Sequence, residues 1–170
     1  MVQRGSSTSK PEKPGAILPI LSQWYERAKL GSINVFNFPP NKHPARDRIR
    51  KLTKGSTCLL FAYDERRLVG EFKVNKVQRL LWKEFQNAKE RAFPSDEARF
   101  PKPNEWCWII EFTDFRVYER PLDEEEVRKV FLEVLGKSAS MRPLHFTQII
   151  DERLIDTIKT IMLILQLIEV

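Results

Sequence analysis

The chain has 170 residues, 42% of them hydrophobic and 31% charged, which is typical of a single globular domain. Its 29 Lys and Arg against 23 Asp and Glu give a net charge of +6, which favours an anionic partner. Two cysteines, Cys58 and Cys107, exclude a disulfide framework or a zinc site. Because both lie in apolar runs, we expect them to be buried, and a single bridge between them is the alternative.

Neither end of the sequence resembles a membrane segment. The N-terminal residues are polar and lack the apolar core of a signal peptide. The apolar run TIMLILQLIEV at the C-terminus is shorter than the ~20 residues that a membrane-spanning helix needs. We therefore expect a cytoplasmic protein with no membrane partner.

The first third of the chain predicts a tail, a helix, a strand and a basic segment. Residues 1–15 are rich in Ser, Lys, Pro and Gly, and we expect a flexible tail before one domain at 16–170. Residues 16–30 carry apolar side chains at helical spacing, and residues 32–38 are typical of a strand. Residues 43–55 (HPARDRIRKLTKG) predict a short basic helix or an ordered loop.

A hairpin is predicted next. Residues 57–64 are almost continuously apolar and indicate a buried strand, which a tight charged turn joins to an alternating strand at 68–76. Gly70 lies in the middle of that second strand, where a glycine weakens pairing. We interpret Gly70 as a bend in a small barrel, and simple tolerance of a weak position is the alternative.

The remainder alternates helices and strands. The predicted elements are a helix at 80–93, a loop at 94–105, a long strand at 105–118, a helix at 121–136, a loop at 137–146 and a last helix from Asp151. Consecutive strands joined by a hairpin, with helices between the others, favour an α+β domain around a small, mostly antiparallel sheet or barrel.

Three segments resemble one known superfamily. KGSTCLLFAYDERRLVGEFKV resembles two successive strands of PUA-like domains, EWCWIIEFTDFRVYERPLD a later strand and MRPLHFTQI the closing segment, and the ASCH and EVE groups are the nearest relatives. The resemblance covers residues 32–150. It implies a pseudo-barrel of about five or six mostly antiparallel strands with flanking helices. It also implies that RNA, or a modified base in nucleic acid, binds in a cleft at the barrel mouth.

The ASCH signature G-x-K-x-x-E is missing, because the first strand is followed by NFPPNKHPARD. No catalytic residue is therefore carried over from that group.

Basic residues concentrate in one segment. Six of them fall between positions 42 and 54: Lys42, Arg46, Arg48, Arg50, Lys51 and Lys54. Such a segment is a candidate site for phosphate groups, although a solvated surface is the simpler interpretation. Arg66 and Arg67, at the hairpin turn, could extend it.

Aromatic and polar residues supply the other candidates. Trp106 and Trp108 alternate along one strand and should face the same side, Trp106 as a stacking platform and Trp108 as a core residue. Asn37 and Phe38 end the first strand and could border the cleft, with a turn and a core position as the alternative. Ser140 and Arg142 could bind a ligand and a phosphate.

These patterns favour a binding module that is not an enzyme, with RNA as the expected partner and DNA as the alternative. A hydrolase or transferase using the same cleft, with Glu71 or Glu105 as its carboxylate, is a second hypothesis. A third is a protein-interaction domain that forms a homodimer through the apolar stripe of the last helix. No cofactor or metal is expected, because His43 and His145 lack metal-ligand spacing.

Overall fold

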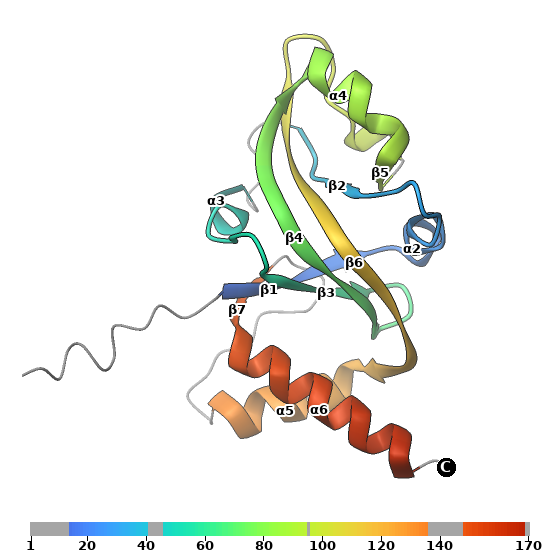
Figure 1. Cartoon of the computed structure of the whole chain (residues 1–170), viewed down its shortest axis with the longest axis vertical. Coiled ribbons are helices and arrows are strands. Elements are labelled where there is room, and N and C mark those ends of the chain that lie inside the picture. The colour runs from blue at the N-terminus through green and yellow to red at the C-terminus, as the bar shows by residue number, and fades with distance from the viewer. Residues whose placement is uncertain (1–13, 41–45, 95, 136–147, 169–170) are drawn as a thin grey trace, which may run out of the picture.

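The computed structural model describes residues 14–40, 46–94, 96–135 and 148–168 (Figure 1). Its strands are β1 (Pro14–Ile20), β2 (Val35–Asn37), β3 (Thr57–Ala62), β4 (Arg67–Leu81), β5 (Ala92–Phe93), β6 (Trp106–Asp123) and β7 (Gln148–Asp151). Its α-helices are α2 (Ser22–Ala28), α3 (Arg46–Ile49), α4 (Trp82–Ala88), α5 (Glu124–Leu135) and α6 (Glu152–Ile168). Short 3-10 turns lie at Lys89–Arg91 and Glu97–Arg99.

The described strands form one sheet in the order β5-β2-β6-β4-β3-β1-β7. The β1–β3 and β2–β5 pairs are parallel, and the other neighbouring pairs whose register is known are antiparallel. Figure 1 shows β4 and β6 as one long curved ribbon, with β2 and β5 beside its upper part and β1 and β3 at its lower part. Helices α2 and α3 lie on opposite sides of this ribbon, and α5 and α6 pack below it. The predicted α+β pseudo-barrel is confirmed.

Aromatic side chains fill the space that the curved sheet encloses. Phe72 of β4 stacks on Phe112 of β6 with their ring centroids 4.2 Å apart, and Phe36 of β2 meets Phe93 edge-on at 5.2 Å. Trp24 from α2 and Ile49 from α3 belong to the same buried cluster, so these helices close the interior from their two sides. A second cluster lies between the outer face of the sheet and α5 and α6, and a third lies under α4.

The helix predicted at 16–30 is wrong over its first half. Residues Pro14–Ile20 form β1, which also takes the last two residues of the predicted tail. β1 lies between β3 and β7, with Ala16 and Leu18 in the interior cluster and Ile17 in the cluster under α6. A strand buried on both faces is apolar at every position, and this pattern is indistinguishable from that of a short buried helix.

Gly70 lies where β4 bends. Leu68 pairs with Leu122 and Gly70 pairs with Val117. A segment that advances two residues along β4 therefore lies opposite one that advances five residues along β6. The pairing with β3 also shifts its register opposite this point. A Cβ atom on Gly70 would lie 2.5 Å from the carbonyl oxygen of Arg116. The glycine therefore permits a close approach of two backbones at a bulge, in agreement with the predicted bend.

The ribbon is longer than the sequence predicted. β4 continues to Leu81, which pairs with Trp106, so the helix predicted from Leu80 begins at Trp82. Cross-strand pairing thus overrides the helical spacing of residues 80–82. Strand β7, which pairs with β1, was not predicted.

Cys58 and Cys107 are buried and free, and burial raises the pKa of the Cys107 thiol to about 12.

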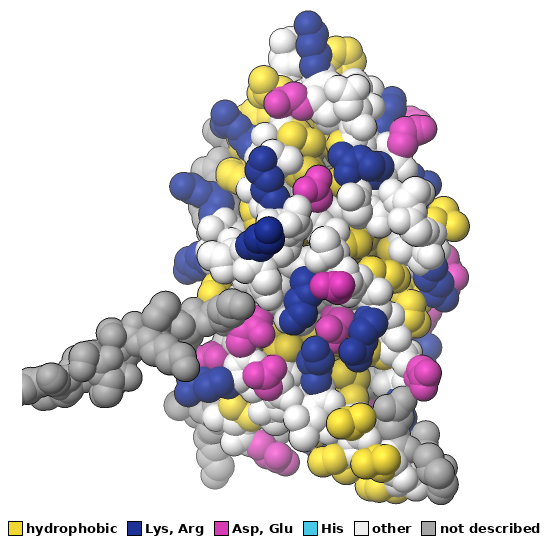
Figure 2. All heavy atoms as spheres, in the orientation of Figure 1, with side chains coloured by type: hydrophobic (Ala, Val, Ile, Leu, Met, Phe, Trp, Pro, Cys, Tyr) yellow, Lys and Arg dark blue, Asp and Glu magenta, His cyan; other side chains and the backbone are white. Residues whose placement is uncertain are grey.

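Helix α6 is only partly covered. Leu154, Ile155, Ile158 and Met162 are buried in the cluster under the sheet. The last turns expose Leu163, Ile164, Leu167 and Ile168, at 59%, 48%, 70% and 72%. Figure 2 shows an apolar group at the corresponding lower end of the molecule. No helix among the described residues is long and apolar enough to cross a membrane.

Candidate functional site

Four side chains around the end of β2 bury polar atoms that have no hydrogen-bond partner. These atoms are Nε1 of Trp24, Nε1 of Trp108, Nε of Arg99 and both amide atoms of Asn37. We call these four residues the buried polar cluster. Leaving a buried polar group unpaired costs about 1–3 kcal/mol, so most native proteins avoid it. Within the described part of the chain, all the buried side-chain polar atoms that lack a hydrogen-bond partner belong to these four residues.

Backbone and ring contacts bring the four residues close together around the end of β2, with the Asn37 side chain on the Ile109 face of the sheet and Trp108 on the other face. Asn37 is the last residue of β2, and its carbonyl oxygen accepts a hydrogen bond from Nη2 of Arg99 at 3.0 Å. The next residue, Phe38, donates its backbone N–H to the carbonyl oxygen of Trp108 at 3.0 Å. The guanidinium of Arg99 lies over the ring of Trp24, 4.7 Å from its centroid. The cluster thus joins β2, β6, α2 and the loop before β6.

Arg99 brings a positive charge into this region. Burial lowers the pKa of Arg99 to about 10, against the opposite effects of nearby Tyr63 and Asp96. The group therefore stays charged at neutral pH, and no ion pair joins it to a carboxylate of the described residues. A partly buried charge that forms no ion pair within the described part of the chain favours an anion or an electron-rich oxygen beside it.

The cluster presents mainly hydrogen-bond donors beside flat rings. Each indole and the Arg99 Nε offer N–H donors, whereas the Asn37 amide both donates and accepts. Such an arrangement suits a planar group with carbonyl oxygens or ring nitrogens at its edge. A nucleobase is a group of this kind, and bases are commonly bound by stacking on aromatic rings and by hydrogen bonds to their edges.

The structure separates the two residues predicted at the end of β2. Asn37 is fully buried and belongs to the buried polar cluster. Phe38 is 2% exposed and packs edge-on against Phe36 at 5.1 Å, so it occupies the core position given as the alternative.

The described part of the basic segment forms one exposed edge near α3. Arg50, Lys51 and Lys54 are exposed, and Arg48 is half-buried. Two hydrogen bonds of 2.8 Å, from the Gly55 N–H to the Val74 carbonyl and from the Val74 N–H to the Ser56 carbonyl, tie this loop to β4. Lys42, Ser140 and Arg142, and the side chain of Arg46, lie outside the residues that the structure describes.

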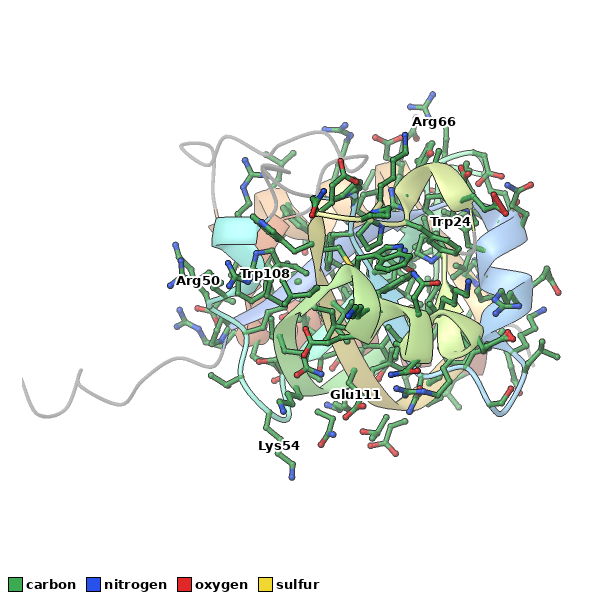
Figure 3. All side chains as sticks on the ribbon, turned by 90° about the horizontal axis from the view of Figure 1, so that it is seen from above. Trp24, Arg50, Lys54, Arg66, Trp108 and Glu111 are labelled. Atoms are coloured by element: carbon green, nitrogen blue, oxygen red, sulfur yellow. The ribbon has the colours of Figure 1, made fainter. Side chains whose placement is uncertain are left out.

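Arg66 and Arg67 lie away from that edge. Figure 3 shows Arg50 and Arg66 on different sides of the molecule, with Trp24 and Trp108 between the outer elements. Arg66 pairs with Glu124 at 2.8 Å, and Arg67 pairs with Glu65 at 2.9 Å. These two cations thus already contact carboxylates.

Trp106 and Trp108 share one face of β6, as predicted. Leu81 pairs with Trp106, and Arg79 pairs with Trp108, in successive positions that face the same side. Trp108 packs against the interior cluster, whereas Trp106 lies near the far end of the ribbon.

The carboxylates proposed for an enzyme lie elsewhere. Glu71 is 3% exposed, accepts a hydrogen bond from the Tyr118 hydroxyl at 2.8 Å and pairs with Lys159 of α6 at 3.1 Å. Glu105 accepts from the backbone N–H of Lys102 at 2.8 Å. Neither joins the buried polar cluster, and the described residues contain no group of three or more potential metal ligands.

Sequence reasoning missed Trp24 and Arg99 as candidate site residues. Trp24 fitted the apolar face of a helix, and Arg99 lay in a loop broken by prolines. Their meeting depends on a contact between distant segments, which no local pattern reveals. An indole N–H on a predicted core face was the one signal present, because a buried indole usually needs an acceptor.

The fold has close counterparts among solved structures. An ASCH mutant protein from Zymomonas mobilis superposes with a TM-score of 0.65 at 10% identity, over 89% of this chain and 98% of that one. Human THYN1 in complex with DNA containing 5-methylcytosine gives 0.57 at 12% identity, over 88% and 97% of the two chains. The N-terminal domain of McrB from Staphylothermus marinus gives 0.54 at 13%, over 85% and 92%.

No protein-family model and no curated protein matches the chain by sequence. Identities this low establish the fold alone. The chain shares the fold of the ASCH and THYN1 structures, which is the fold that the resemblance of its sequence implied.

Proposed function

We propose that this domain binds nucleic acid and holds one unstacked base against the buried polar cluster. The observation that carries the proposal is the set of unpaired N–H groups on Trp24, Trp108 and Arg99, together with the unpaired amide of Asn37. A ligand that pairs these atoms recovers the free energy that their burial costs the free protein. THYN1, which has the same fold, is seen bound to DNA containing a modified base, and this supports the proposal.

The phosphates of the bound strand would lie along the exposed cations near α3. Arg50, Lys51 and Lys54 come from one short segment, and Arg48 lies beside them. Contacts of this type add affinity without sequence preference and weaken as salt rises. The expectation that the natural partner is RNA rests on the resemblance, and RNA and DNA probes in parallel decide it.

The proposal is tested by removing one donor while keeping its ring. Trp24→Phe retains the ring under Arg99 but loses the indole N–H. We expect this change to weaken the binding of an oligonucleotide with an unpaired base about tenfold, the value of one well-placed hydrogen bond of ~1.4 kcal/mol. Fluorescence anisotropy with labelled single-stranded RNA, single-stranded DNA and fully paired duplex measures the affinities.

Tyr118→Phe is the matched control, because it also keeps an aromatic ring and removes one buried donor, whose partner Glu71 lies outside the cluster. Equal affinities of the two variants would argue against the cluster as the base site. Failure of the wild-type protein to bind any of the probes would refute the nucleic-acid function.

The end of α6 supports self-association as a second proposal. Leu163, Ile164, Leu167 and Ile168 are each about half exposed or more, which is unusual for four neighbouring apolar side chains. A second copy of the chain would bury them, and Leu167→Asp should then abolish the dimer in sedimentation equilibrium. A wild-type protein that remains monomeric at high concentration would contradict this proposal.

A further inference from the structure

The far end of the ribbon has two faces with different roles. On one face Leu80, Cys107 and Ile109 pack with Phe85 of α4 in an apolar cluster. On the other face, the pair Arg79–Trp108 and then the pair Leu81–Trp106 extend the sheet from the barrel interior toward the end of the ribbon. Leu81 is 53% exposed there. Trp108 packs against the interior cluster, and Trp106 lies beyond it on the same face and is half-buried.

A hollow opens at the end of this face. It has a volume of about 440 Å³ and is lined by Leu81, Trp82, Lys83, Pro103, Asn104, Glu105 and Trp106. A volume of this size is within the range of small-ligand sites and exceeds what one base requires. We call Arg79 together with the hollow's two tryptophans, Trp82 and Trp106, the outer aromatic site.

The charges around the hollow favour a polyanion. The guanidinium of Arg79 lies 5.3 Å from the centroid of the Trp106 ring, so it can contact a phosphate while its flat face rests on the indole. Lys83, which also lines the hollow, is exposed. Glu105 is the one carboxylate lining the hollow among the described residues, and its Oε1 accepts from a backbone N–H.

We propose that the outer aromatic site stacks a second, unpaired base of the strand whose first base is held at the buried polar cluster. Trp108 belongs to the cluster, and Trp106 lies two residues along the same face of β6, about 7 Å away. A single strand leaving the cluster along this face meets Trp106 next. The inference rests on the proposed function and names its partner: a strand that is unpaired on both sides of the bound base, rather than a duplex with one extruded base.

The test compares two probes of equal length. One is a single strand, and the other is a duplex in which a single central base is unpaired. Trp106→Leu should lower the affinity for the single strand about 5- to 100-fold, which is the usual effect of losing one stacked base. Its affinity for the duplex should change less than twofold, because the bases that flank the unpaired one are already stacked on each other.

Three further measurements keep the test decisive. Trp106→Phe retains a ring and should bind the single strand within about threefold of the wild type. Lys129→Gln, an exposed cation on α5 at the other end of the molecule, should leave the ratio between the two probes unchanged. In the wild-type protein, 2-aminopurine placed next to the bound base should change its fluorescence when it stacks on an indole, and this readout requires no variant.

The outcomes separate the two proposals. Wild-type binding to both probes with no effect of Trp106→Leu and no change in 2-aminopurine emission overturns the outer aromatic site and leaves the base site intact. An equal loss on both probes also overturns it. Absence of any binding by the wild type overturns the proposed function, and the outer aromatic site with it.

Discussion

Replacing Asn37 by Leu should stabilise the protein and weaken its binding at the same time. Asn37 is 0% exposed, and neither atom of its amide has a partner. The residue opposite it, Ile109, and its neighbour Val35 are both buried and apolar. Leu has the same branched skeleton, so Asn37→Leu removes an unpaired amide from an apolar environment. The free energy of unfolding should rise by about 1–3 kcal/mol, which corresponds to a melting temperature roughly 3–9 °C higher.

The same substitution removes a donor and an acceptor from the base site. We expect affinity for an oligonucleotide with an unpaired base to fall about 10- to 100-fold. Urea unfolding followed by circular dichroism measures the stability, and fluorescence anisotropy measures the binding. Asn75→Leu is the matched control, because its amide donates to Glu111 at 2.9 Å. That variant should lose about 1 kcal/mol of stability and bind normally.

Two results would refute this reasoning. If Asn37→Leu is less stable than the wild type, the amide has a structural role and its burial is not a cost. If the variant is more stable but binds equally well, Asn37 is a buried polar residue without a function in binding. Only a gain in stability together with a loss in affinity would show that Asn37 lowers the stability of the fold and contributes to binding.

Three other changes test separate parts of the account. Gly70→Ala should destabilise the fold by about 1–3 kcal/mol in urea unfolding, since its Cβ would lie 2.5 Å from a carbonyl oxygen of β6, whereas Gly31→Ala, with open space around it, should be nearly neutral. Burial raises the pKa of Glu124, but hydrogen bonds from two arginines outweigh it and leave the pKa below its usual value. The stability that Glu124 adds should therefore be present at pH 7 and lost progressively as pH falls below about 4, so the difference between Glu124→Gln and the wild type should be largest at pH 7 and shrink below that pH. Neutralising Arg50 and Lys54 together should flatten the plot of log affinity against log salt by up to ~2 units, and an unchanged slope would exclude phosphate contacts there.

Much of the fold follows from local patterns, because a hairpin is a local structure. The apolar run of β3, the tight charged turn and Gly70 predicted both the pairing of β3 with β4 and the bend in β4. β1 was mistaken for a helix, since a strand buried on both faces has no alternation to distinguish it. The ends of β4 were missed for a related reason: Leu81 remains in the strand because β6 lies beside it.

The candidate site was less accessible to sequence reasoning. Asn37 was predicted from its place at the end of a strand, and the shared face of Trp106 and Trp108 followed from their alternation. Arg99 could not be predicted, because its significance arises from the ring of Trp24, which is 75 positions earlier in the chain. Charge density indicated the segment around α3, but charge alone does not reveal where a base is held.

The most direct test of the central claim is an NMR titration that follows the indole N–H groups. The chain contains four tryptophans, so a ¹H–¹⁵N spectrum should show four indole signals, assignable by single Trp→Phe variants. On addition of an oligonucleotide with an unpaired base, the account predicts that the Nε1 signals of Trp24 and Trp108 shift downfield and become protected from solvent exchange, as unpaired donors gain acceptors. Shifts confined to Trp82 and Trp106, or no shift while the oligonucleotide binds, would show that the base is held elsewhere.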